Sequence, residues 1–262
     1  MPVRPTKMDL ERLYRKYNRR SWVHPDPLEF LYGYPELADR EVAGMVAATL
    51  AYGRVAQIIK SAGAVLNALG PSPARALLMT APDAVSQRLC GFVHRFATAD
   101  RVCAMLAGLR QVLTRYGTLQ ACFCTHRRTG QKDLTFALNG LVEEILAGAG
   151  TDPGHLLPLP SRKSACKRLH LFLRWMVRSD AVDPGGWDRV SCADLLVPLD
   201  VHMHRAGRLL GFTDRRAGDL ATAQQITEGF RRLCPEDPVR YDFALTRVGM
   251  GGDSTFHELF QG

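Results

Sequence analysis

The segment SACKRLHLFLRWMVR, residues 164–178, is the part of the sequence that most clearly predicts a helix. Its apolar positions recur at the spacing i, i+3, i+4, i+7, i+8, which predicts one buried face. On the opposite side, at about 100° per residue, fall Lys167, Arg174 and Arg178, which predict an exposed basic stripe. The buried face comprises Leu169, Phe172, Leu173, Met176 and Val177.

Lys167 stands in the first turn of this helix, where a cation is mildly disfavoured because the helix start carries about half a positive charge. One interpretation is a tolerated surface lysine on a solvated, charged face. The other is a lysine whose amine is required, since the helix dipole and the neighbouring Arg168 would favour the neutral, nucleophilic form. The spacing alone favours the first interpretation.

A second helix start lies in LLVPLDVHMHRAGRLLGF, residues 195–212. Pro198 ends the preceding segment, Asp200 occupies the N-cap position, and Gly211 is the expected stop. Aspartate is a common helix cap that contributes about 1 kcal/mol, but a carboxylate at a helix start can also face a cleft. Lys167 and Asp200 are therefore candidates to converge at one site.

The run DVHMH, residues 200–204, contains residue types that bind metals, yet residues two apart on a helix point about 200° away from each other. His202 and His204 therefore do not share an ion on a regular helix, and the sequence carries no HExxH-type signature. We expect no metal and no other cofactor.

Helical periodicity is widespread along the chain, and strand-like alternation is almost absent, which predicts an all-α fold with about ten helices. Residues 39–69 are interpreted as one long helix or two consecutive helices, with Gly53 and Gly63 as the possible breaks. Ser72 and Pro73 form the favoured pair of cap and first-turn residues for a further helix.

The chain has 262 residues, of which 46% are hydrophobic, enough for one large domain or two lobes. Its net charge of +8 favours a polyanionic partner, either nucleic acid or a membrane surface.

The seven cysteines are odd in number and form no CxxC pair, which argues against a disulfide framework, a zinc ribbon and a four-cysteine iron–sulfur site. The longest apolar stretch is about half of the ~20 residues that a membrane span needs. We therefore expect a cytoplasmic, nucleoid-associated protein that does not bind a membrane.

The segment VPLDVHMHRAGRLLG, residues 197–211, resembles a segment of the helix–hairpin–helix DNA glycosylase superfamily in which an aspartate at a helix start is catalytic. SACKRLHLFLRWMV resembles the helix that carries the Schiff-base lysine in the bifunctional members of that superfamily. The 33-residue separation of Lys167 and Asp200 is similar to that of the archaeal 8-oxoguanine DNA glycosylases. Nearly the full chain resembles an uncharacterised bacterial family thought to belong to the superfamily, through LAYGRV (50–55), FVHRF (92–96) and DPVRYDFAL (237–245).

The resemblance implies a DNA glycosylase and abasic-site lyase of base excision repair. Lys167 would attack the sugar C1′ and expel the damaged base, and Asp200 would stay ionised and stabilise the positive charge that develops on the sugar. The resemblance also implies a monomer with two lobes around a basic cleft that binds double-stranded DNA. The central helices, about 70–190, would form one lobe, and the N- and C-terminal helices would contribute to the other.

The sequence departs from the superfamily at the hairpin before the lysine, which usually carries glycines whose amides hold phosphate. Here the matching segment is LPLPSRKSACK, residues 157–167, which contains no glycine. Arg162, Lys163 and the helix start are expected to provide the phosphate contact instead. The other expected phosphate contacts are Arg168, Arg174, Arg178, His202 and Arg205, together with RLYRKYNRR (12–20), Arg127 and Arg128.

The base pocket is expected to include Tyr52, Arg54 and Gln57, because LAYGRVAQ resembles a pocket-lining helix of the superfamily. Trp175 and Phe243 are further candidates, and packing in the core is the alternative for Tyr52 and Trp175.

The sequence does not decide whether the damaged base is 8-oxoguanine or another lesion, or whether the substrate is DNA or RNA. Three other functions remain open: a non-catalytic nucleic-acid binding module that retains the fold, a structural protein, and a lysine-dependent enzyme that acts on a small carbonyl compound.

Overall fold

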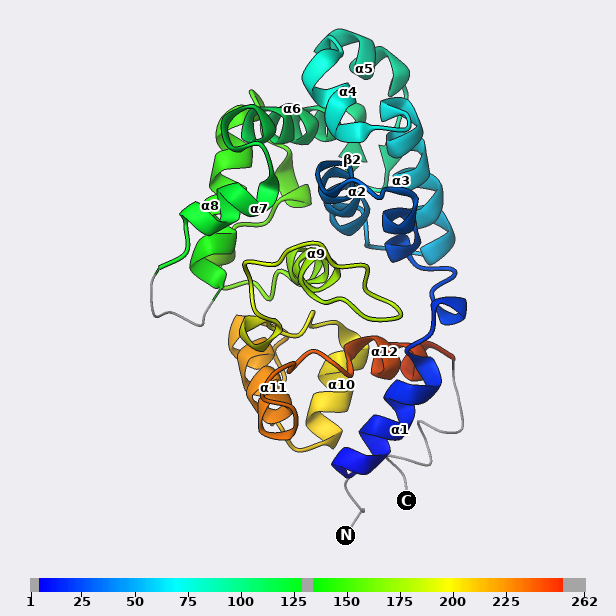
Figure 1. The fold of residues 1–262 in the computed structure, drawn as a ribbon, viewed down its shortest axis with the longest axis vertical. Helices are drawn as coiled ribbons and strands as arrows, with labels where there is room; N and C mark the ends of the chain where they lie inside the picture. The colour runs from blue at the N-terminus through cyan, green and yellow to red at the C-terminus, as the bar shows by residue number, and fades with distance from the viewer. Residues whose placement is uncertain (1–4, 129–133, 252–262) are drawn as a thin grey trace. The chain divides into compact units, whose positions relative to one another are not determined.

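The computed structural model describes residues 5–128 and 134–251. The described residues form twelve α-helices, short 3-10 helices and a single two-stranded antiparallel sheet, which confirms the all-α prediction (Figure 1). The chain divides into two compact units. Unit 1 comprises residues 1–24 and 163–262, and unit 2 comprises residues 25–162.

Unit 2 is a continuous segment in which the helices α6 and α8 form the most extensive pair. Its elements are η2 (Pro27–Gly33), α2 (Leu37–Thr49), α3 (Val55–Leu69), α4 (Pro73–Met79), α5 (Pro82–Arg88), β1 (Val93–His94), β2 (Ala97–Thr98), α6 (Ala99–Tyr116), α7 (Leu119–Thr125), α8 (Thr135–Gly148), η3 (Gly154–Leu156) and η4 (Pro160–Arg162).

Unit 1 joins both ends of the described chain, because α1 lies beside α12 (Figure 1). Its elements are α1 (Lys7–Tyr17), η1 (Arg20–Trp22), α9 (Lys167–Val177), η5 (Cys192–Asp194), α10 (Val201–Leu209), α11 (Leu220–Leu233) and α12 (Asp242–Gly251).

The division into units differs from the one expected from the resemblance, which placed residues 70–190 in one lobe. The helices α2 and α3 belong with α4–α8, and the lysine helix α9 belongs with α10–α12. Helical periodicity identifies which face of a helix is buried but not which other helix covers it. The spacing of apolar residues therefore does not predict where one unit ends and the other begins.

The segment 39–69 contains two helices, α2 and α3, rather than one. The chain turns between them at Gly53, whose φ of 96° is readily adopted only by glycine. Gly63, the other expected break, lies in the interior of α3. A single glycine within a helix costs about 1 kcal/mol but does not end it.

Two acidic side chains of α2 cap other helices of unit 2. Asp39 accepts hydrogen bonds from the Ala74 amide at 2.8 Å and from the Ser72 hydroxyl at 2.9 Å at the start of α4. Glu41, which is fully buried, accepts from the Leu119 and Gln120 amides at 2.7 and 2.8 Å at the start of α7. These carboxylates satisfy amides that have no partner within their own helices and bind α2 to both helices.

The lysine helix α9 supplies much of the core of unit 1. All five residues of its expected buried face lie in the core. None of the described helices is long and apolar enough to pass through a membrane.

Candidate active site

Lys167 and Asp200 lie together in unit 1, each at the start of a helix. Lys167 is the first residue of α9, and Asp200 is the N-cap of α10. Lys167 Nζ lies 3.5 Å from Asp200 Oδ2, and the two side chains are 36% and 14% exposed. The primary amine is therefore within reach of solvent and of a carboxylate at the same time.

Asp200 uses its two carboxylate oxygens differently. Oδ1 accepts a hydrogen bond from the Met203 amide at 2.8 Å, which confirms the predicted N-cap, and Oδ2 faces Lys167. The cap bond restricts the side chain to the rotamer that keeps the second oxygen near the amine. The helix start thus holds a negative charge in a fixed position beside Lys167.

The backbone that leads into α9 adopts left-handed conformations without glycine. Lys163 has a φ of 61° and Cys166, the N-cap of α9, has a φ of 42°. Non-glycine residues in this region cost of order 1 kcal/mol, so neighbouring contacts must hold the segment in place. Two such contacts are the Leu220 amide, which donates to the Lys163 carbonyl at 3.2 Å, and the bridge between Ser164 and Asp219. Residues 157–167, which contain no glycine, therefore still adopt left-handed backbone conformations at two positions.

A buried network of ion pairs lies along the far part of α9. The Arg174 guanidinium donates to Asp183 at 3.0 and 3.1 Å and forms a short contact with Asp242. The Arg178 guanidinium contacts Asp183 and donates to Asp237 at 2.9 to 3.1 Å. Arg178 also pairs with Asp180 at 2.8 Å.

The prediction that Lys167, Arg174 and Arg178 form an exposed basic stripe on α9 is therefore wrong for Arg174 and Arg178. Arg174 and Arg178 are 3% and 4% exposed, and their guanidinium groups are occupied by aspartates. The helical periodicity correctly predicts that Arg174 and Arg178 lie opposite the apolar face. That side of the helix is nevertheless buried, because aspartates from later in the chain cover it. These arginines hold unit 1 together and are not placed to contact phosphate.

Asp242 connects this network to the candidate site. It is buried at the start of α12 beneath Arg174. Burial raises the pKa of Asp242 to about 6; Arg174 opposes that shift, and the negative charge of Asp200 adds to it. Sequence reasoning did not single out Asp242. The signal that could have found it is its position in the first turn of α12.

The other expected phosphate contacts differ in their placement. Lys163 and Arg205 are exposed in unit 1, whereas Arg168 and His202 are partly buried there. Arg162 is exposed at the end of η4 and belongs to unit 2. Lys163, Arg168, His202 and Arg205 thus lie in the same unit as Lys167 and Asp200.

Two of the expected base-pocket residues are in the core of unit 1. Trp175 is 1% exposed, and Phe243 is buried with the Arg247 guanidinium 4.9 Å from its ring. Neither ring presents an accessible face on which a base could stack, so their assignment to a base pocket is corrected to core packing. Both lie on apolar helix faces, which sequence spacing does not distinguish from the lining of a pocket.

Tyr52, Arg54 and Gln57 belong to unit 2, where Tyr52 is part of a hydrogen-bond network. The Tyr52 hydroxyl donates to the His94 carbonyl at 3.0 Å and lies 2.8 Å from His155 Nε2. Because the tyrosine proton is already used, His155 Nε2 must carry the donating hydrogen. Arg54 is exposed at the N-cap of α3, and Gln57 is exposed and donates to Ser61 at 3.1 Å.

Ser61 extends this network to His94, which is fully buried in unit 2. His94 Nε2 lies 3.1 Å from the Tyr52 carbonyl, which only accepts, so this nitrogen is the donor. His94 Nδ1 then accepts from the Ser61 hydroxyl at 2.9 Å. The network fixes Tyr52 against the β1–β2 hairpin, which supports the structural interpretation of this tyrosine. His94 and His155 were not singled out from the sequence, because neither stands in a recognisable spacing.

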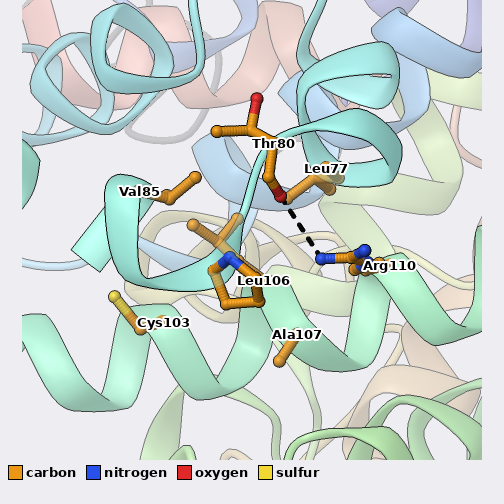
Figure 2. Close-up of a pocket in the computed structure, with 8 residues that line it drawn as sticks. Leu77, Thr80, Val85, Cys103, Leu106, Ala107 and Arg110 are labelled. Atoms are coloured by element: carbon orange, nitrogen blue, oxygen red, sulfur yellow. Dashed lines mark hydrogen bonds between the residues drawn. The ribbon is translucent and has the colours of Figure 1, made fainter.

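Unit 2 also contains a small apolar pocket between α4, α5 and α6 (Figure 2). Leu77, Val85 and Leu106 line it, and the Arg110 guanidinium donates across one side to the Thr80 carbonyl at 3.3 Å. Burial raises the pKa of the Cys103 thiol at its edge, which disfavours a nucleophilic thiolate. The pocket contains none of the residues expected to form a site.

Within the described ranges, no three or more His, Cys, Asp or Glu side chains are grouped so as to hold a metal ion. The candidate site brings together an amine and a carboxylate, each at the start of a helix.

These features define a helical protein of two compact units with a paired lysine and aspartate. The chain belongs to a family described as "Protein of unknown function (DUF2400)", whose model matches residues 26–251. No curated protein and no solved structure matches the chain. The matched range includes both Lys167 and Asp200.

Proposed function

We propose that the protein is a DNA glycosylase and abasic-site lyase that acts through a Schiff base on Lys167. The observation that supports this most directly is the 3.5 Å contact between Lys167 Nζ and Asp200 Oδ2, since both residues stand where the resemblance requires a nucleophilic lysine and a catalytic aspartate. The substrate would be double-stranded DNA with a damaged base, such as 8-oxoguanine, or an abasic site.

The chemistry follows from the two groups. The Lys167 nitrogen would bond to C1′ of the deoxyribose as the glycosidic bond breaks, and the base would leave with the bonding electrons and take up a proton. Loss of one proton from the attached nitrogen, followed by opening of the sugar with transfer of a proton to O4′, would give an iminium. Asp200, fixed by its cap bond, would accept a proton from the amine and stabilise positive charge on the sugar.

The iminium also explains strand cleavage. It acidifies the C2′ hydrogen, so loss of that proton drives β-elimination: the C3′–O bond breaks, and the strand segment on the 3′ side leaves with a phosphate at its 5′ end. Water then hydrolyses the iminium and regenerates the lysine. Lys163 and Arg205, both exposed in unit 1, and the partly buried Arg168 and His202 would contact the phosphates of the bound strand.

Reductive trapping tests this proposal. The protein is incubated with a duplex that carries an abasic site or 8-oxoguanine, and borohydride is added to reduce any iminium to a stable secondary amine. We expect a covalent protein–DNA band that is absent with Lys167→Gln. Lys60→Gln, which removes an exposed lysine of α3 in unit 2, is the matched control and should retain the band.

Asp200→Asn distinguishes the role of Asp200 as a helix cap from its role in the reaction. The asparagine oxygen can still accept the hydrogen bond from the Met203 amide, but the negative charge is lost. We expect the unfolding free energy to change by no more than about 1 kcal/mol, while the yield of trapped adduct falls at least about tenfold. An unchanged band with Lys167→Gln would refute the mechanism. Absence of any band with the wild type, with duplex binding intact, would instead support a non-catalytic nucleic-acid binding module.

A further inference from the structure

The outer face of α1 and the following η1 form a strongly basic surface in unit 1. Residues 12–24 contain five lysine or arginine residues and no aspartate or glutamate. All five of these cations are exposed. We define the α1–η1 surface as Arg15, Lys16, Arg19, Arg20 and Trp22; the fifth cation, Arg12, pairs with Asp9 at 3.4 Å.

Trp22 differs from the other two tryptophans of the chain. Its side chain is 42% exposed, whereas Trp175 and Trp187 are buried. The Trp22 ring packs against Tyr17 with 4.9 Å between ring centroids and an angle of 60° between the rings. The indole thus packs against a buried tyrosine, and the exposed Arg19 and Arg20 precede Trp22 closely in the sequence.

The opposite face of α1 is anchored to unit 1. Leu10, Leu13 and Tyr17 are buried. Glu11 accepts from the Tyr241 hydroxyl at 2.7 Å and from Arg240 at 3.1 Å. The basic face therefore belongs to a helix that is already held in place. Binding of a partner does not carry the entropic cost of ordering this helix.

We propose that the α1–η1 surface binds nucleic acid, with its cations on phosphates and Trp22 stacked on an unpaired base. Guanidinium and ammonium groups beside an exposed aromatic ring are the combination that binds single strands, because phosphates and base faces are both satisfied. An anionic membrane is the less suitable partner, since an interfacial helix inserts an apolar face and that of α1 is already buried. The proposal goes beyond the lyase chemistry, and it stands if that chemistry fails, because Lys167 and Asp200 take no part in it.

The charge component is tested by equilibrium binding of fluorescein-labelled oligodeoxythymidine and of an undamaged duplex between about 50 and 200 mM salt. We expect Arg19→Gln/Arg20→Gln to lower the salt dependence for the duplex by about two in the slope of log K against log salt. Arg208→Gln/Arg232→Gln removes the same charge from exposed positions of unit 1 elsewhere and is the matched control. Equal slopes for the two double variants would overturn the assignment.

The stacking component has its own readout. Binding of oligodeoxythymidine should quench tryptophan emission in the wild type, and this quenching should disappear in Trp22→Phe because the remaining tryptophans are buried. Trp22→Ala should weaken oligodeoxythymidine binding at least about fivefold, and Trp22→Phe, which keeps an aromatic ring, by less. Quenching that persists in Trp22→Phe would overturn the role of Trp22.

Two further measurements keep the outcomes distinct. Binding to phosphatidylserine vesicles that is lost in Arg19→Gln/Arg20→Gln, without any binding of nucleic acid, would overturn the proposal in favour of a membrane. The Lys167→Gln variant should bind oligodeoxythymidine like the wild type, so failure of the lyase proposal leaves this one unaffected.

Discussion

At the scale of single residues, the candidate site depends on how charges are arranged around α9. Lys167 has one aspartate beside it, whereas Arg174 and Arg178 together face Asp180, Asp183, Asp237 and Asp242. Four carboxylates around two guanidinium groups carry an excess of negative charge if all are ionised. Proton uptake by one buried carboxylate relieves that excess, and burial raises the pKa of both Asp183 and Asp242.

Asp242 is expected to make stability fall as the pH rises from about 4 to 6. Its pKa is raised from 3.8 to about 6 by burial, so the unfolded chain releases this proton at a lower pH than the folded chain. Between these values the unfolded state binds fewer protons, and the free energy of unfolding decreases with rising pH. The contribution is at most about 3 kcal/mol, and it is constant above about pH 6.

Asp242→Asn isolates this titration, because asparagine keeps the shape and an acceptor for Arg174 but has no proton to lose. Urea unfolding of both proteins between pH 4 and 7 gives the difference in unfolding free energy. As the pH rises, the wild type should lose unfolding free energy relative to Asp242→Asn. A difference that does not change with pH would contradict the raised pKa.

The residue scale also shows what local sequence could predict. Asp200 as an N-cap and Lys167 in a first turn follow from neighbours within a few positions, and both are confirmed. The burial of Arg174 and Arg178 depends partly on Asp242 and Asp237, which lie 68 and 59 residues further along the chain. A helical wheel contains no information on such distant partners. The periodicity therefore predicts that Arg174 and Arg178 are exposed, whereas the structure has them in a buried network of ion pairs.

At the scale of the elements, two glycines in helix interiors illustrate how packing overrides propensity. A Cβ on Gly108 of α6 would lie 2.1 Å from the Ile145 carbonyl oxygen of α8. A Cβ on Gly63 of α3 would meet only the Phe30 ring, at 3.5 Å, an ordinary contact. Helix propensity favours alanine over glycine by about 1 kcal/mol at both positions.

The two alanine substitutions should therefore have opposite signs. Gly63→Ala is expected to raise the unfolding free energy by about 0.5 to 1 kcal/mol. Gly108→Ala is expected to lower it by about 1 to 3 kcal/mol, since α6 and α8 must separate to admit the methyl group. Urea unfolding measures both, and a stabilising Gly108→Ala would show that the two helices do not pack this closely.

Sequence patterns located most elements but not the contacts that fix them to one another. Proline, glycine and helical spacing predicted the helices α9 and α10 and the turn at Gly53. Ser72 was expected to cap α4 by itself, yet its hydroxyl donates to Asp39, which caps the helix in its place. Capping by a residue more than 30 positions away has no local signature.

At the scale of the whole molecule, the chain builds one unit from a continuous segment and the other from two separate ones. Unit 2 satisfies its buried carboxylates and its tyrosine–histidine network within residues 25–162. Unit 1 needs α1 from the N-terminal segment, which buries Leu10, Leu13 and Tyr17. At about 1.5 to 3 kcal/mol per buried side chain, these three contribute about 5 to 9 kcal/mol, comparable to the whole stability of a domain.

The two units should therefore behave differently when they are produced alone. We expect the fragment 25–162 to unfold cooperatively in urea, as followed by circular dichroism. The fragment 163–262 should show a broad transition or none, because the side of α12 that α1 covers is exposed. Adding a peptide of residues 5–24 should restore cooperative unfolding, since it supplies the three buried side chains and the partner of Arg240.

A peptide that carries Leu13→Asp is the matched control, because it places a charge in the core and should restore nothing. The wild-type peptide should act in a concentration-dependent way, as mass action requires for a partner that binds only the folded fragment. If the fragment 163–262 unfolds with the same midpoint and slope with and without the wild-type peptide, α1 is dispensable for unit 1. The α1–η1 surface would then be a separately attached arm rather than a fixed face of that unit.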